Sequence, residues 1–393
     1  MNFSKPVVLI DSFKLEGHHE GYLEYYYNQL SRLGLEIKIL VADSKDADRI
    51  ARRIMSIDDK SIKYFKSHFA ISFLTKLNAW IRLQSIESLI FWLRLNLSLR
   101  QFKINKPYIP FILWFPLKYA NNTQLSHWAI PQDIVILDGL SINPTLVENM
   151  GFDVNFTVNN SLYRSSSIKS ILLLNEEACR YYQSIGITNC YWLPEAILLK
   201  KNELQHSWLI NEIKELPLAR NVVLYVGGLS QRKKEILGFC RLASKYSEDS
   251  VSFLAVGSLY RDHFTDEEFN QYLELKNTIS NLFIIEKRAC DEELYDLLEL
   301  SNTVFLVYPN HPYSSSFMTM AISAGRSVIV KGDSLMARRA GKYGIGITYE
   351  ELMSNPDILL MDRVEEDKIE LFRHDHSDEV IQNTLTRAFG LRT

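Results

Sequence analysis

The sequence predicts an α/β protein of two domains, each built around a parallel β-sheet. Its 393 residues are enough for two domains of roughly 100–200 residues each. Short apolar runs rich in β-branched residues alternate with helical runs along the chain, as they do in βαβ units. A polar stretch at residues 200–218 interrupts this series, and the series then begins again. We therefore expect one domain on each side of that stretch.

In the first half, strands are expected at the apolar runs 7–11, 35–41, 133–137, 154–158, 170–174 and 190–193. A helix is expected over 22–33. The loop between the first strand and this helix, SFKLEGHHEG, holds His18 and His19. Ligands of open α/β sheets bind at the carboxyl ends of the strands, so both histidines are candidate ligand contacts. A solvated loop that caps the helix is the alternative interpretation.

The second half repeats the pattern, with strands expected at residues 221–226, 251–256, 281–285, 304–308 and 327–330. The intervals between these strands are helical in character. Two Rossmann-like domains in tandem imply that they face each other across a cleft. We predict an N-terminal domain at 1–198, a C-terminal domain at 199–375 and a helix within 376–393 that packs back on the N-terminal domain.

Residues 62–118 differ in composition and are predicted to form a basic, aromatic helical insertion. They contain nine Lys or Arg residues, one acidic residue (Glu87) and twelve aromatic residues. Cationic segments rich in aromatic residues suit the headgroup region of an anionic membrane. The alternatives are a buried pair of helices whose lysines reach the solvent, and a site for single-stranded nucleic acid. We expect no nucleic-acid partner, because no RNA-binding motif is found and the net charge is −3.

The composition and the cysteine spacing indicate a globular protein of a reducing compartment. Hydrophobic residues make up 47% of the chain and charged residues 23%, which is ordinary for globular proteins. The four cysteines have no C-x-x-C spacing, which argues against a zinc site and against a disulfide framework. The first residues run directly into a strand, so no signal peptide is expected, and no apolar run reaches about 18 residues. We therefore predict a cytoplasmic protein.

The segment GGLSQRKKE, which follows the first strand of the second half, is a candidate phosphate-binding loop. Gly227 and Gly228 permit a tight turn. Arg232, Lys233 and Lys234 come next and would neutralise the charge of a departing diphosphate. The spacing is not that of a P-loop. Three adjacent cations are also typical of a solvated surface, and this alternative stays open.

Three consecutive serines, Ser314, Ser315 and Ser316, precede another predicted helix. A helix N-terminus offers unpaired N–H groups and the positive end of a dipole to an anion, and the hydroxyls add donors. A serine that only caps the helix is the alternative. Because the carboxyl ends of parallel strands share one edge, we expect the serines and the GGLSQRKKE loop to meet at one ligand. Lys287 and Arg288, at a third strand end, are expected to contact a nucleobase.

Taken together, these motifs resemble the donor domain of GT-B glycosyltransferases, especially the retaining enzymes of family 4. The matching segments are GGLSQRKKE, FLAVG, FIIEKR and SSSFMTMAISAGRSVIV, while SILLLNEEA and CYWLPEAI resemble the acceptor domain. A Ser-rich turn replaces the family's Glu-x7-Glu motif, since Pro312 and Met320 stand at its two positions. Gly228 stands at the position of a family arginine, and Asn159 at that of the acceptor-domain histidine.

The resemblance implies a metal-independent, retaining glycosyltransferase that moves a sugar from a nucleoside diphosphate sugar to a glycan or a lipid-linked acceptor. It also implies a role in surface polysaccharide or glycolipid assembly. The N-terminal domain would bind the acceptor and the C-terminal domain the donor. No cofactor is expected besides the donor substrate. The enzyme would be cytoplasmic, with peripheral contact to the inner face of the plasma membrane.

The same resemblance implies roles for the candidate residues. The expected catalytic residues are His18 and His19, next to the acceptor or the reacting sugar, and Lys233 and Lys234, next to the departing diphosphate. The expected donor-binding residues are Gly227, Gly228, Arg232, Lys287, Arg288, Ser314, Ser315 and Ser316. Because the family's glutamates are replaced, a catalytically silent GT-B protein that serves as partner or scaffold of another glycosyltransferase is the alternative. A GT-B-like epimerase or phosphorylase is a third interpretation.

Overall fold

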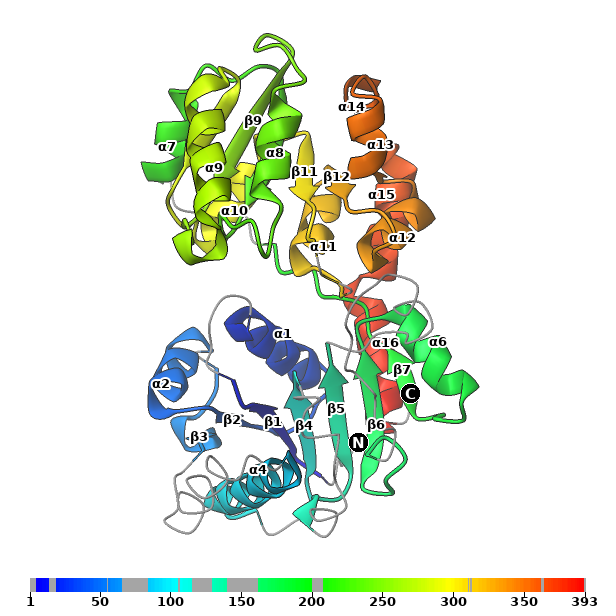
Figure 1. Cartoon of the computed structure of the whole chain (residues 1–393). Helices are drawn as coiled ribbons and strands as arrows, with labels where there is room; N and C mark the ends of the chain where they lie inside the picture. The colour runs from blue at the N-terminus through cyan, green and yellow to red at the C-terminus, as the bar shows by residue number, and fades with distance from the viewer. Residues whose placement is uncertain are drawn as a thin grey trace. The chain divides into compact units, whose positions relative to one another are not determined.

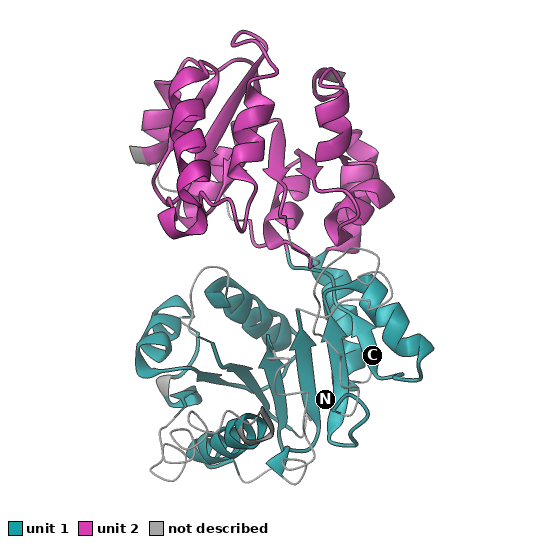
Figure 2. Cartoon of the chain, viewed as in Figure 1, with its two compact units in different colours: residues 1–196, 377–393 teal, residues 197–376 magenta. Residues whose placement is uncertain are grey.

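The computed structural model describes residues 5–13, 19–54, 56–65, 84–104, 107–114, 129–139, 162–199, 208–309, 311, 313–361 and 364–391 (Figure 1). The chain forms two compact units. Unit 1 consists of residues 1–196 together with 377–393, and unit 2 consists of residues 197–376 (Figure 2). Each unit contains its own sheet and its own hydrophobic core.

The sheet of unit 1 has the strand order β3-β2-β1-β4-β5-β6-β7, and all of its strand pairs are parallel. Its strands are β1 (Val7–Asp11), β2 (Ile37–Val41), β3 (Ile62–Tyr64), β4 (Ile109–Leu113), β5 (Ile134–Asp138), β6 (Ile168–Leu173) and β7 (Cys190–Trp192). The central strands are apolar throughout because helices cover both of their faces. The order of strands reverses between β1 and β4, which is where an open α/β sheet forms its binding crevice.

The helices of unit 1 are α1 (His19–Arg32), α2 (Ser44–Arg53), α4 (Gln84–Leu99), α6 (Glu176–Ser184) and α16 (Asp378–Phe389), with 3-10 turns η1 (Asp59–Ser61) and η2 (Arg100–Phe102). α4 and α6 cover one face of the sheet through Trp92 and Tyr182. α1 and α16 cover the other, where the Phe111 ring lies 5.8 Å from the ring of Tyr26 and 5.4 Å from that of Phe389.

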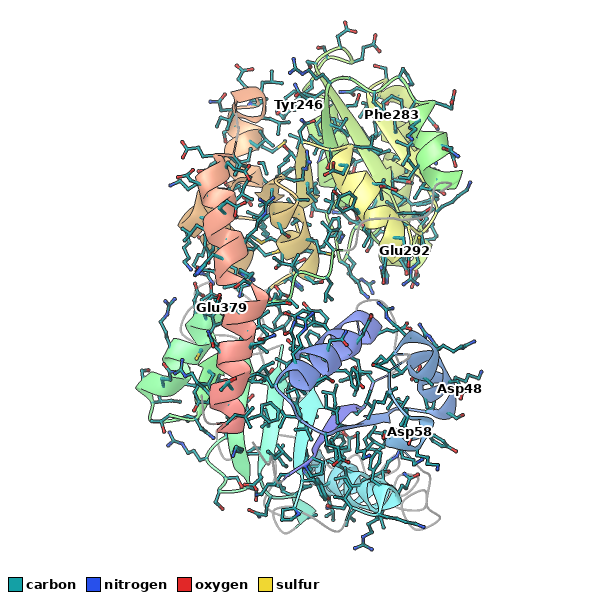
Figure 3. All side chains as sticks on the ribbon, turned by 180° about the vertical axis from the view of Figure 1, so that it is seen from behind. Asp48, Asp58, Tyr246, Phe283, Glu292 and Glu379 are labelled. Atoms are coloured by element: carbon teal, nitrogen blue, oxygen red, sulfur yellow. The ribbon has the colours of Figure 1, made fainter. Side chains whose placement is uncertain are left out.

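The C-terminal helix α16 therefore belongs to unit 1, although the chain reaches it from unit 2. Figure 3 shows it from behind, with Glu379 near its start. Asp378 accepts hydrogen bonds of 2.7 Å from Tyr25 and from Arg32 of α1. At its other end, the Ser170 hydroxyl of β6 donates to the carbonyl of Ala388 over 2.9 Å.

The predicted helical insertion at 62–118 is corrected in its described part. It is helical over α4 and η2, but its two ends form strands, β3 paired with β2 and β4 paired with β1. β4 is buried along its whole length, and Ile62 of β3 is buried as well, but the composition averaged over the whole segment conceals these short apolar patterns. Phe65, Phe91, Trp92 and Phe111 are core residues. Lys66 and Lys76, two cations of the predicted membrane-contacting segment, lie outside the described residues.

The sheet of unit 2 is also parallel, with the order β10-β9-β8-β11-β12-β13. Its strands are β8 (Asn221–Val226), β9 (Val251–Val256), β10 (Leu282–Ile285), β11 (Thr303–Leu306), β12 (Ser327–Val330) and β13 (Gly346–Thr348). Here the order reverses between β8 and β11. The two strand ends that precede GGLSQRKKE and the three serines are therefore neighbours, as the sequence predicted.

The helices of unit 2 are α7 (Trp208–Lys214), α8 (Ile236–Ala243), α9 (Asp266–Thr278), α10 (Asp291–Glu299), α11 (Ser316–Ser323), α12 (Leu335–Tyr343), α13 (Tyr349–Ser354), α14 (Ile358–Met361) and α15 (Glu366–Asp375), with the 3-10 turn η6 (Arg261–His263). One face carries α8, α9, α13 and α14, and the other carries α7, α10, α11, α12 and α15. Tyr246, labelled in Figure 3, links the first face to α14 by donating to the Pro356 carbonyl over 2.7 Å.

The stretch at 200–218, which was predicted as a polar connection, contains helix α7 in its described part. Leu209 and Ile213 of α7 are fully buried, and the helix contacts α10. The few apolar residues of this stretch are spaced so that they lie on one face of a helix. The mean composition of the stretch is polar and conceals this pattern. Among the described residues, no helix combines the length and the apolar character that crossing a membrane requires.

Candidate active site

The loops that follow β8 and β11 meet where the strand order of unit 2 reverses. The backbone N–H of Glu235 donates to the carbonyl of Val307 over 3.2 Å and so ties the two loops together. The β8 loop also lies directly against the end of β9, because a Cβ atom on Gly257 would stand 1.5 Å from the carbonyl oxygen of Gly227. Gly227 itself has φ +122°, a backbone conformation that other residues rarely adopt.

The three cations of the β8 loop have different environments. Arg232 and Lys233 are exposed, whereas Lys234 is half-buried. The Lys234 ammonium group donates to the carbonyl of Val226 and lies 5.1 Å from the ring centroid of Tyr308 and 5.9 Å from that of Phe317. A cation is stabilised at the face of an aromatic ring. Of the three predicted cations, Lys234 is thus the one whose charge the structure places at the reversal point.

Both glycines of the turn are covered by side chains. A Cβ atom on Gly227 would lie 2.7 Å from the Lys234 Nζ atom, and one on Gly228 would lie 2.8 Å from the ring of Tyr260. Tyr260 is 46% exposed and stacks on His263 with a centroid distance of 5.2 Å. The glycines therefore let a cation and an aromatic ring approach the turn. Neither Tyr260 nor His263 was predicted, although Tyr260 follows the glycine that ends β9.

The Ser-rich turn forms the start of helix α11. Ser315 is the N-cap residue in an extended conformation, and its side chain makes no capping hydrogen bond. Ser314, Ser315 and Ser316 are half-buried. The alternative in which one serine only caps the helix is therefore not what the structure shows for Ser315. Phe317, in the first turn of α11, lies 5.9 Å from the Lys234 ammonium group, so the start of α11 is close to the β8 loop.

His311, which was not predicted, lies between β11 and the serines. Its Nε2 atom is 3.1 Å from the carbonyl oxygen of Ser314. Its ring centroid lies 4.9 Å from that of Tyr308 and 5.3 Å from that of Tyr313. Burial lowers the pKa of His311 below the usual histidine value, and the charge of Lys234 lowers it further, while the hydrogen bond to Ser314 acts in the opposite direction.

Lys287 and Arg288 follow β10, the strand at one edge of the unit 2 sheet. Both are exposed, and the Lys287 ammonium group pairs with Glu212 of α7 over 3.3 Å. The neighbouring Glu286 accepts hydrogen bonds from Lys276 over 2.6 Å and from Tyr272 over 3.1 Å. In the strand order, β8 and β9 separate this position from β11.

A cavity of about 380 Å³ adjoins the β8 loop. Its lining includes Gln231, Arg232, Glu235, His263, Glu268 and Pro309. The His263 Nδ1 atom is 2.9 Å from the Ser230 hydroxyl, which in turn accepts the backbone N–H of Lys233 over 3.1 Å. Arg232 thus belongs both to this cavity and to the predicted donor site. The cavity is lined by this cation and by the carboxylates of Glu235 and Glu268.

Unit 1 has a polar pair at its own reversal point. Asp11 ends β1 and is completely buried, and its Oδ2 atom lies 3.0 Å from Nδ1 of His19 at the start of α1. The rings of Phe13 and Trp114 flank His19 at centroid distances of 5.7 and 5.4 Å. Burial raises the pKa of Asp11, and the hydrogen bond and charge of His19 lower it in part. His18, the other predicted histidine, lies outside the described residues.

This pair combines a buried carboxylate with a histidine whose side chain is 20% exposed. A carboxylate bonded to one ring nitrogen fixes the orientation and the tautomer of an imidazole. The sequence pointed to the histidine but not to Asp11, although an acid that ends an apolar strand was visible in it. Among the described residues, no group of three or more His, Cys, Asp or Glu side chains is arranged to hold a metal ion.

Comparison with known proteins gives matches to solved structures only. No protein-family model matches the sequence, and no curated protein does. Anabaena Alr3699/HepE, solved in complex with UDP and glucose, matches with a TM-score of 0.63 and 12% identity over 98% of this chain and 99% of its own. WaaG, a glycosyltransferase involved in lipopolysaccharide biosynthesis, matches with a TM-score of 0.57 and 12% identity over 98% and 99%.

A putative UDP-N-acetylglucosamine 2-epimerase from Listeria monocytogenes matches equally well, with a TM-score of 0.61 and 12% identity over 99% of this chain and 98% of its own. The matches span both units, and identities this low establish the fold alone. Two parallel sheets of seven and six strands, each with a reversal of strand order and helices on both faces, make this chain a protein of the GT-B fold.

Proposed function

We propose that the protein is a glycosyltransferase that moves a sugar from a nucleoside diphosphate sugar to an acceptor. The observation that carries the proposal is the position of Lys234, a half-buried cation at the reversal point of unit 2, beside the serine-lined start of α11. A pair of phosphates needs such a combination of fixed positive charge and N–H donors. The structural likeness to a protein solved with UDP and to a glycosyltransferase supports this assignment.

In this proposal, unit 2 binds the diphosphate of the donor. Lys234 faces the phosphates, Ser315 and Ser316 donate hydroxyl and N–H groups, and the exposed Arg232 and Lys233 complete the positive surface. As the bond between sugar and phosphate breaks, negative charge grows on the diphosphate, and these fixed groups stabilise it. The side chains supply the compensating charge that a metal ion supplies in other transferases, so the proposal requires none. Lys287 and Arg288 remain candidates for the nucleobase.

Unit 1 would bind the acceptor or the reacting sugar through His19. Asp11 holds the ring of His19 by a 3.0 Å hydrogen bond, so the imidazole is oriented before the substrate arrives. A histidine placed in this way can bind a sugar hydroxyl or take up its proton. We also propose retention of the anomeric configuration, which the resemblance to family 4 supports.

Donor turnover tests the proposal. Thermal shift with UDP and GDP identifies the nucleotide, and ¹H NMR then follows the matching sugar nucleotides in the presence of the protein. Release or transfer of the sugar would support a transferase, and the anomeric coupling of the first product would report retention or inversion. Stable binding without turnover, with or without added acceptors, would instead favour a silent GT-B partner. Conversion of the donor to its epimer would replace the proposal with an epimerase.

We further propose that the acceptor is a glycan or lipid-linked and that the protein works at an anionic membrane surface, in surface polysaccharide or glycolipid assembly. The basic composition of residues 62–118 supports this. Replacement of Lys63, Lys66 and Lys76 by Gln should weaken binding to vesicles that contain anionic lipid, measured by co-sedimentation. The matched control replaces Lys214, Lys245 and Lys368 of unit 2. Equal loss in both variants, or in neither, would contradict a specific membrane contact.

A further inference from the structure

His311 stands next to the charged group of the donor site without touching it. Lys234 lies 5.1 Å above the ring of Tyr308, and the ring of His311 lies 4.9 Å from the same tyrosine. The loop that carries His311 is held at its start, because Lys331 donates to the Pro309 carbonyl over 2.9 Å. At its end it runs directly into Ser314 and Ser315. The His311 ring is thus held by the Ser314 carbonyl and by the rings of Tyr308 and Tyr313.

The hydrogen bond of His311 decides which ring nitrogen titrates. Nε2 lies 3.1 Å from the carbonyl oxygen of Ser314, and a carbonyl can only accept. Nε2 therefore carries a proton in both charge states, and Nδ1 is the atom that gains or loses one. Protonation of His311 does not break this bond, so the change of charge needs no rearrangement of the loop.

In the protein without ligand, the surroundings of His311 favour its neutral form. The ring is largely buried, which lowers its pKa, and the positive charge of Lys234 adds to this lowering. Among the described residues, the titratable and charged groups that face it are Lys234 from the β8 loop and the phenols of Tyr308 and Tyr313, while Lys331, after β12, binds the Pro309 carbonyl of the same loop. Lys234 and Lys331 are both positive, so a bound anion would reverse the balance.

We propose that His311 takes up a proton when a nucleoside diphosphate binds, so that the donor site acquires a further positive charge together with its ligand. This inference rests on the proposed function. A diphosphate at Lys234 and Ser315 would offset the lysine charge and place negative charge beside the imidazole, which favours the imidazolium form. The same proton leaves with the product, so His311 in the free site returns to its neutral form beside the half-buried Lys234.

Two consequences can be measured. Nucleotide binding consumes up to about one proton per site at a pH between the two pKa values of His311. In that interval, the affinity for nucleotide weakens by up to about tenfold per pH unit as the pH rises. Phosphate groups of the nucleotide also titrate near pH 6, but they contribute equally in every variant. The difference between the wild type and a variant at position 311 therefore isolates the histidine.

Isothermal titration of UDP and GDP, in two buffers of different ionisation enthalpy at several pH values from 6 to 8, provides the test. The variants are His311→Gln and His311→Phe, of which the second keeps a ring between Tyr308 and Tyr313. His374→Gln on α15 is the matched control, because its side chain is 73% exposed. We expect the wild type and His374→Gln to take up more protons than both variants at position 311.

Equal proton uptake in the wild type and His311→Phe would overturn the proton linkage while leaving the proposed function intact. Absence of binding by any nucleotide would overturn both. If neither variant folds, ¹⁵N NMR of the His311 ring in the wild-type protein decides the matter. A pKa that rises when nucleotide is added would support the proposal, and an unchanged pKa would refute it.

Discussion

At the scale of single residues, Lys234 differs from Arg232 and Lys233 in what surrounds its charge. The exposed neighbours interact with a ligand through water, where an ion pair contributes only about 0–1 kcal/mol. The ammonium group of Lys234 is enclosed by the Val226 carbonyl and by three aromatic rings. Three adjacent cations in the sequence thus differ in the environment of their charge.

Replacement of Lys234 by Met should weaken nucleotide binding by about ten- to a hundredfold. Methionine keeps the length and the apolar contacts with Tyr308 and Phe317 but removes a charged hydrogen bond worth about 1.5–3 kcal/mol. Lys233→Met is the matched control and should change the affinity only a few-fold. Calorimetric titration with the preferred nucleotide measures both. A Lys234→Met protein with wild-type affinity would remove this residue from the donor site, and the double change of Lys233 and Lys234 to Ala should abolish binding.

Replacement of Asp11 by Asn should keep or raise the Tm at pH 8 and lower donor turnover. Because burial raises its folded pKa above the unfolded value, Asp11 stabilises the protein most at low pH, and this contribution is lost as the pH rises through the folded pKa. Asp11→Asn removes this dependence and still accepts a hydrogen bond. We therefore expect its Tm at pH 8 to equal or exceed that of the wild type, while donor turnover falls about tenfold or more because His19 loses its charged partner.

The matched control is Asp378→Asn, which should behave in the opposite way. Partial burial acts to raise the pKa of Asp378, but hydrogen bonds from Tyr25, Gln29 and Arg32 bring it below the usual value. Its contribution to stability is present at high pH and is lost as the pH falls through the folded pKa. Asp378→Asn should thus lower the Tm at pH 8 without changing turnover. Reduced Tm and unchanged turnover in Asp11→Asn would contradict a role in orienting His19.

At the scale of elements, the geometry of the proposed donor site depends on how closely the ends of β8 and β9 approach. The glycine at the end of each strand leaves room for the backbone of the other, and nothing in a single strand pattern requires this contact. The predicted strands that the structure describes were placed well because apolar runs are local features, whereas the strand predicted at 154–158 lies outside the described residues. The strands β3 and β4 and the helix α7 were not predicted, because composition averaged over residues 62–118 and 200–218 hid the short apolar patterns within these segments.

Gly257→Ala should destabilise unit 2 and disrupt nucleotide binding. The new methyl group would meet the Gly227 carbonyl at 1.5 Å, so the β8 turn would have to move. Overpacking of this kind usually lowers the free energy of unfolding by about 1–3 kcal/mol or more. Gly341→Ala on α12 is the control, because a Cβ atom there meets nothing within 4 Å and should stabilise the helix by about 0.5–1 kcal/mol. Urea denaturation compares the two, and equal stability would contradict the close contact.

At the scale of the whole molecule, unit 1 is assembled from two parts of the chain. Residues 377–393 return to it after unit 2 is complete, and they supply α16, which covers one face of its sheet. Phe389 is 2% exposed and packs edge-on against Phe111 of β4. The last turn of α16 is therefore part of the core of unit 1.

Phe389→Ala should lower the stability of unit 1 by about 3–5 kcal/mol, since a buried aromatic ring is removed. Hydrogen exchange followed by mass spectrometry should show faster exchange in β4 and β6 and unchanged exchange in β8 and β9. Leu371→Ala on α15 is the control, because Leu371 is 50% exposed and should change stability by no more than about 0.5 kcal/mol. Equal acceleration in both units would show that α16 stabilises the chain as a single cooperative body.

The fold class, the alternation of strands and helices, and the two loops of the proposed donor site could be predicted from the sequence, because they follow from local apolar patterns and from the rule that ligands bind at the carboxyl ends of strands. The structure was needed to show that Lys234 is the enclosed cation, that Asp11 holds His19, and that His311 lies beside Tyr308. Burial and hydrogen bonding of these side chains depend on residues distant in the chain, and spacing along the sequence contains no information about which of them meet.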